Sequence, residues 1–337
     1  MKYEVKKRSL LSWRLKLLLT LLVLIIPAYY FGPRLYYQFV DDPLLRLRKR
    51  TEALNARWSR EKNGSPDKLV AFIRDVRKLL VILEKDRPAD GDIQYYGGLY
   101  YFYDLLLRLR LDETSLVLLS GREILPEAGR LRNVKPRATK ILARKSVVGI
   151  RKALALGVSE RFRANALLIL VYGDLLNDSR TDPYLMELLR SIRPNRLSPV
   201  LRPYYDWIAL FLFSMKGSVK ELRALTEELK QPAASRKGGA KRIVLSDATR
   251  DLILCYGEFR GRNYLQALQL TRSILKSERL SPLTREEAHR IEGEVFLNQR
   301  GLQAALNYYK SVLKDGKGGA FLRERTAALE KQNEKKR

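Results

Sequence analysis

The segments YLQALQLTRSILKS (residues 264–277) and GLQAALNYYKSVLKD (residues 301–315) align with Ala267 opposite Ala305, an offset of 38 residues. The segments before them align as well, with Cys255 opposite Gly293 and Glu258 opposite Phe296. Apolar residues in both copies recur at helical intervals. A helical hairpin that repeats every 35 to 40 residues or so is typical of an α-solenoid.

Helical periods also dominate the rest of the chain, and the alternating pattern of a β-strand is hard to find. The turn signals predict helices over 43–63, 66–86, 92–109, 113–124, 136–156, 159–177, 182–192, 201–216, 218–230, 245–260, 263–278, 284–299, 301–314 and 320–334. Gly97 and Gly98 mark a close helix–helix contact. The predicted fold class is all-α.

The C-terminal hairpins resemble the tetratricopeptide repeat (TPR) family. That family places a small residue, an aromatic residue, an alanine and a bulky residue at spacings of 3, 9 and 4, which Gly293, Phe296, Ala305 and Tyr309 fit. The same spacing fits Gly173, Leu176, Leu185 and Leu189, with leucine in place of the aromatic residue and the alanine. The resemblance covers roughly residues 90–335. It implies an α-solenoid of TPR-like hairpins that binds other proteins.

The N-terminus predicts a membrane anchor. Residues 1–16 are basic, and Leu17 to Pro33 is a run of seventeen residues without a charge. We therefore expect a basic cytoplasmic N-terminus at 1–16, a transmembrane signal anchor at 17–40, membrane-proximal helices at 43–110 and a TPR-like solenoid at 111–335. The excess of cations before the span places the C-terminal domain outside the cytoplasm, in the periplasm of a bacterium, with the protein in the inner membrane. A cleaved signal peptide and a buried core helix are the alternatives.

The residue inventory favours a protein that is not an enzyme. The chain has one His and one Cys, which excludes disulfides within the chain, Cys-based zinc sites and paired-His metal sites, and we expect no cofactor. His289 is predicted to be a surface residue and Cys255 a buried, inert thiol. The carboxylates Glu286, Glu287, Glu292 and Glu294 alternate with arginines, as in ordinary surface pairing.

The charge is unevenly spread. The chain has 65 Lys and Arg against 37 Asp and Glu, and no acidic residue occurs in the thirty-two positions from Ala128 to Ser159. Lys140, Arg144, Arg151 and, less closely, Arg137 share one helical face. The candidate contacts in this run are Arg137, Lys140, Arg144, Lys145, Arg151 and Lys152. A second basic run, Arg236 to Arg242, lies in a predicted loop.

This basic face has several interpretations. It is a solvated surface, or it binds an acidic protein, anionic lipid headgroups or a polyanion. We do not expect nucleic acid, because the predicted anchor places the domain outside the cytoplasm and aromatic residues are missing from the 130–152 run.

The helix at 92–109 carries aromatic residues around its whole circumference. Core and hairpin packing explain most of them, but one side of a solenoid helix is often exposed. Tyr100, Tyr101 and Tyr103 are therefore further candidate contacts for a partner.

The predicted function is a non-enzymatic, membrane-anchored, TPR-like scaffold or adaptor. It would bind protein partners during assembly of a cell-envelope complex, such as a flagellar-motor accessory or a secretion structure. The alternative is a binder of anionic lipid or polymer through the basic face 130–152.

Overall fold

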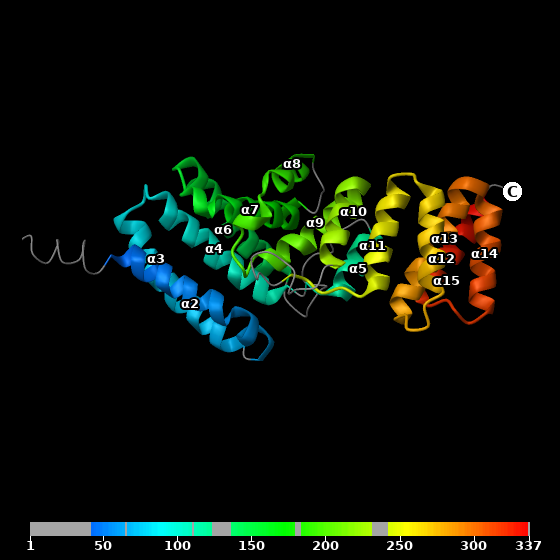
Figure 1. Ribbon diagram of the computed structural model, residues 1–337, viewed down its shortest axis with the longest axis horizontal. Helices are drawn as coiled ribbons and strands as arrows, with labels where there is room; N and C mark the ends of the chain where they lie inside the picture. Colours follow the sequence, from blue (N-terminus) through cyan, green and yellow to red (C-terminus); the bar gives the residue numbers. More distant parts are fainter. Residues whose placement is uncertain are drawn as a thin grey trace, which may run out of the picture. The chain divides into compact units, whose positions relative to one another are not determined.

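The computed structural model describes residues 42–64, 66–109, 111–122, 136–178, 183–230 and 242–335 (Figure 1). These residues form fourteen α-helices and one 3-10 turn. The elements are α2 (Pro43–Gly64), α3 (Pro66–Asp86), α4 (Gly91–Arg108), α5 (Glu113–Arg122), α6 (Pro136–Ala155), α7 (Glu160–Asp178), α8 (Pro183–Ser191), η2 (Pro194–Arg196), α9 (Arg202–Lys216), α10 (Val219–Lys230), α11 (Asp247–Arg260), α12 (Tyr264–Leu275), α13 (Pro282–Arg300), α14 (Leu302–Lys314) and α15 (Ala320–Glu334).

The all-helical part of the predicted fold class is confirmed for these residues, which contain no strand. Helix boundaries follow the turn signals closely. Ser281 accepts a hydrogen bond from the backbone N–H of Thr284 and caps α13, where the Ser–Pro pair predicted a break.

The transmembrane part of the predicted fold class requires correction. In the part of the chain that the structure describes, no helix combines the length and the apolar character needed to cross a bilayer. The predicted anchor at 17–40 and the basic segment at 1–16 lie outside the described residues. The structure therefore does not support a membrane-spanning fold class or the predicted inner-membrane location.

The chain divides into two compact units, Met1–Arg57 and Trp58–Arg337. Of the first unit, the structure describes only residues 42–57, the beginning of α2. The second unit holds the helices discussed below.

α4 and α6 pack with their backbones in contact. A Cβ atom built on Gly98 would lie 2.9 Å from the carbonyl oxygen of Ser146, and one built on Gly149 would lie 2.9 Å from the backbone nitrogen of Gly98. The Ser146 hydroxyl donates a hydrogen bond of 2.9 Å to the Gly98 carbonyl. The predicted close contact is confirmed at Gly98, because only glycine lets two helix backbones approach so closely.

The helices α11 to α15 pack in chain order (Figure 1). Each of them contacts the next, and α11 also contacts α13, while α13 contacts α15. This pattern is compatible with a helical solenoid, in which each hairpin stacks on its neighbour.

α5 departs from that order, because it contacts α9 and α11. The carbonyls of Ser120 and Gly121, near the end of α5, accept hydrogen bonds from the guanidinium groups of Arg260 and Arg290. Two later helices thus satisfy carbonyls that a helix end leaves without partners.

Candidate protein-interaction site

The outward face of α6 carries the cations predicted to contact a partner. All six are exposed: Arg137, Lys140, Arg144, Lys145, Arg151 and Lys152. The opposite face of α6 is buried, through Ala143, Val147, Ile150 and Ala153. α6 is therefore an amphipathic helix with its cations in solvent, as the periodicity predicts.

Two apolar side chains lie exposed among these cations. Ile141 is 47% exposed and Val148 is 60% exposed. Seven residues make almost two helical turns, so Ile141 and Val148 lie in one row along α6. The same spacing places a row of cations on each side, Arg137–Arg144–Arg151 and Lys145–Lys152. We call this surface, residues 137–152 with their exposed side chains, the α6 face.

The cations of the α6 face differ in their intramolecular contacts. Arg151 donates to Asp174 at 2.9 Å, and the Lys145 amine lies 5.3 Å from the centre of the Tyr101 ring. In the described part of the chain, neither Arg137 nor Arg144 forms an ion pair. These two arginines are therefore the cations most available to a partner.

The remaining predicted cations fall in two groups. Arg130, Arg132 and Lys135, which belong to the run without acidic residues, lie outside the described residues, and so do residues 236–241 of the second basic run. Arg242 is described and lies between α10 and α11, outside any helix as predicted, but it is not a surface cation. Its side chain is 5% exposed and pairs with Asp206 and Glu228.

The tyrosines of α4 are placed differently from the prediction. Tyr100 is fully buried and Tyr103 is 1% exposed, because α3, α6 and α7 all pack around α4. The prediction that these tyrosines lie on an exposed side of the helix is therefore wrong for Tyr100 and Tyr103. Tyr101 is half-buried, beneath the Arg77 guanidinium at 3.9 Å from its ring centre.

No protein-family model, curated protein or solved structure matches this chain. The TPR resemblance therefore stays a prediction. The two glycines that fit the small-residue position of the TPR pattern, Gly293 and Gly173, have different neighbours in the structure. A Cβ on Gly293 would meet the ring of Tyr309 in the following helix, whereas one on Gly173 would meet Val147 in the preceding helix. The match of Gly173 to the TPR spacing therefore does not correspond to a close contact with the following helix, α8.

α13 is more deeply buried than its charged sequence predicts. The predicted surface residues Glu286, Glu287 and Glu292 are all at most 9% exposed. Each carboxylate accepts hydrogen bonds from a neighbouring helix: Glu286 from the Leu322 backbone N–H, Glu287 from the Tyr256 hydroxyl and Glu292 from the Tyr308 hydroxyl. Glu294 pairs with Arg325 of α15. These carboxylates bind the hairpins together.

His289 is also buried, at 8% exposed, so its prediction as a surface residue is wrong. Its Nδ1 lies 2.8 Å from the Tyr308 hydroxyl, which donates its only proton to Glu292. Nδ1 therefore carries a proton and donates it to Tyr308. Burial lowers the pKa of His289, against the opposing effect of Glu292.

Cys255 is buried, as predicted, and its thiol contacts the Ala267 carbonyl of α12 at 3.4 Å. Burial raises the pKa of the thiol well above its ordinary value. Across the described ranges, no group of three or more His, Cys, Asp and Glu side chains is placed to hold a metal ion.

The lowered pKa of His289 predicts a pH dependence of stability. Below the ordinary histidine pKa of about 6.5, the unfolded chain takes up a proton that the folded chain resists, so stability falls as the pH decreases through this range. Urea unfolding of the wild type at pH 7 and pH 5 should show a larger loss than unfolding of His289→Asn, which keeps an N–H donor but does not titrate. Equal losses in the two proteins would contradict this assignment.

Proposed function

We propose that this chain is a non-enzymatic helical scaffold that binds an acidic protein partner through the α6 face. The observation that carries the proposal is the row of exposed apolar side chains, Ile141 and Val148, between two rows of cations. Two exposed apolar side chains in one row between cations offer a partner an apolar contact as well as charge.

The chemistry of the α6 face defines the partner. Its cations attract a negatively charged surface and orient it during encounter, and this effect weakens with salt. Ile141 and Val148 offer apolar area that a partner can remove from water, at roughly 25 cal/mol per Å². The matching surface is an amphipathic segment whose apolar residues are flanked by carboxylates.

A binder of anionic polymer is the rival function. Such a ligand needs the cations and makes no use of Ile141 and Val148. Variants that change the charges and the apolar row separately therefore distinguish the two functions.

The test uses the tagged full chain, crosslinked in its native cells and purified for mass spectrometry. Arg137→Glu/Arg144→Glu removes the two cations with no ion pair in the described residues and leaves the Arg151–Asp174 pair intact. Ile141→Ser/Val148→Ser removes the apolar row. We expect each double variant to reduce recovery of an acidic partner protein about tenfold, which corresponds to about 1.4 kcal/mol.

The control is Arg323→Glu/Lys331→Glu, which makes the same change in net charge at two exposed positions of α15. It should retain the partner. Retention by Ile141→Ser/Val148→Ser, together with an anionic polymer as the recovered material, would reject the proposal in favour of the rival.

A further inference from the structure

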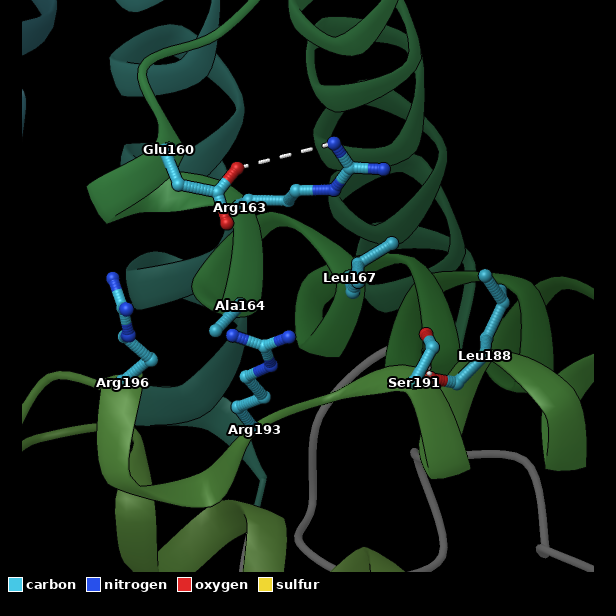
Figure 2. A pocket seen from close by; sticks show the side chains of 8 residues that line it. All are labelled: Glu160, Arg163, Ala164, Leu167, Leu188, Ser191, Arg193 and Arg196. Carbon is cyan, nitrogen blue, oxygen red and sulfur yellow. Dashed lines mark hydrogen bonds and ion pairs between the residues drawn. The ribbon is translucent and has the colours of Figure 1, made fainter.

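A hollow of about 520 Å³ lies between α7, α8 and η2, and Figure 2 shows its lining. We call it the α7–α8 hollow. It is lined by Glu160, Arg163, Ala164, Leu167, Leu188, Ser191, Arg193 and Arg196. Three arginines against one carboxylate leave the lining with an excess of two positive charges.

Arg193 and Arg196 lie at the two ends of the short turn η2. Arg193 precedes the 3-10 turn η2 and Arg196 ends it. Figure 2 shows the Arg193 side chain extending toward Ala164 of α7 and the Arg196 side chain at the outer edge of the hollow. Each guanidinium group is thus placed to bind a carboxylate at the edge of the hollow.

The turn that carries these arginines is fixed to α7. Ile192 and Leu197, the residues that flank Arg193 and Arg196, are buried. The backbone N–H of Ser198 donates to Asn165 of α7 at 3.0 Å. The two guanidinium groups therefore project from an anchored backbone, which reduces the entropy that binding would cost.

The positive charge of the hollow is poorly compensated. Arg163 and Glu160 are 3.9 Å apart and both more than 60% exposed, so their interaction is weak. Neither Arg193 nor Arg196 pairs with a carboxylate among the residues that the structure describes. Two guanidinium groups are thus available for an anion.

The floor of the hollow is apolar. Ala164 is 7% exposed, and Leu167 and Leu188 are half-buried. The Ser191 hydroxyl already donates to the Leu188 carbonyl at 2.7 Å. A bare phosphate ion would contact the arginines and leave this apolar floor in water.

We infer that the α7–α8 hollow holds an acidic peptide segment of a protein partner. An apolar side chain of the segment contacts Leu167 and Leu188, and carboxylates on either side of it contact Arg193 and Arg196. The inference rests on the proposed function, because it assumes that the chain binds protein, but it assigns a second contact site away from the α6 face residues.

Three synthetic peptides test this assignment by ligand-observed NMR titration of the full chain. The probe is Gly-Glu-Leu-Glu-Gly, and the matched peptides Gly-Gln-Leu-Gln-Gly and Gly-Glu-Ser-Glu-Gly lack the charge or the apolar side chain. We expect both matched peptides to bind about fivefold more weakly or worse, which is a loss of about 1 kcal/mol.

The variant Arg193→Ala/Arg196→Ala should raise the dissociation constant of the probe about tenfold, whereas Arg193→Lys/Arg196→Lys keeps the charge and should recover part of the affinity. The control Lys276→Ala/Arg279→Ala removes two exposed cations that are also three residues apart, in the segment between α12 and α13. It should leave the dissociation constant unchanged. Circular dichroism checks that each variant is folded.

The inference fails if Gly-Glu-Ser-Glu-Gly binds as tightly as the probe. It fails likewise if inorganic phosphate displaces the probe from the chain as effectively as an excess of peptide does. It also fails if Arg137→Glu/Arg144→Glu abolishes probe binding while Arg193→Ala/Arg196→Ala does not, since the peptide then binds the α6 face. That last result would leave the proposed function standing. Conversely, the crosslinking experiment can fail to recover a partner through the α6 face. If probe binding still depends on Arg193 and Arg196, the assignment of the α7–α8 hollow stands.

Discussion

Gly98→Ala is expected to lower the free energy of unfolding by about 2 kcal/mol, because overpacking typically costs about 1–3 kcal/mol and the added helix propensity returns less than about 1 kcal/mol. The new Cβ would lie 2.9 Å from the Ser146 carbonyl oxygen, a backbone atom that moves only if α4 and α6 separate. Such a separation also weakens the hydrogen bond from the Ser146 hydroxyl to the Gly98 carbonyl. Urea denaturation of the full chain measures the effect.

The neighbouring Gly97 provides a matched control. A Cβ at Gly97 would meet only the carboxylate end of Glu84, which is a flexible side chain that can move aside. Gly97→Ala should therefore change stability by less than about 1 kcal/mol in either direction. If the two alanine variants unfold at the same urea concentration, the contact between α4 and α6 is looser than described.

Asp206→Ala is expected to have the largest effect, a loss of about 3–5 kcal/mol. Asp206 is completely buried and pairs with Arg242 at 2.5 Å and Arg202 at 3.5 Å, and both arginines are at most 10% exposed. Burial raises the pKa of Asp206, while the hydrogen bond from Arg242 opposes that shift. Removing the carboxyl leaves two guanidinium groups buried, with Glu228 as their remaining partner.

The control for this variant is Asp174→Ala. Asp174 also pairs with an arginine, but Arg151 is 60% exposed and water can replace its partner. The loss should be below about 1 kcal/mol. Thermal and urea unfolding measure the loss of stability in both variants. Equal losses would contradict the expected difference between a buried and an exposed ion pair.

The helices and one close contact follow from local patterns. Gly, Pro and Ser place the ends of the helices, and the paired glycines of α4 predict its contact with another helix. Gly149, which completes that contact on α6, is a single glycine within a regular amphipathic helix. Its partner lies about fifty residues earlier in the chain, and the local sequence does not reveal such a pairing.

The predictions about exposure fail where neighbours cover a helix on several sides. Charge alternation makes Glu286 and His289 resemble surface residues, but α14 and α15 supply the groups that bond them. The predicted exposure of Tyr100 and Tyr103 is wrong for the same reason, since three helices surround α4. An amphipathic pattern shows which face of a helix is apolar, and it does not show how many neighbours will pack against that helix.

The candidate site is predicted in part. The cations of the α6 face follow from their spacing, and Ile141 and Val148 could have been recognised as apolar residues seven apart on the same face. The α7–α8 hollow could not, because Leu167 and Arg193 come from separate elements and become neighbours only when η2 packs on α7.

The bonds at the end of α5 have a consequence for the order in which the chain folds. The carbonyl of Gly121 accepts its hydrogen bond from Arg290, which a ribosome adds 169 residues later. Until then α5 has α9 but lacks the later groups that complete its packing, so the early helices leave the ribosome with an open surface that a chaperone can bind. Residues 247–300 thus complete the packing of a helix made long before them, and synthesis interrupted before this point leaves α5 only partly covered.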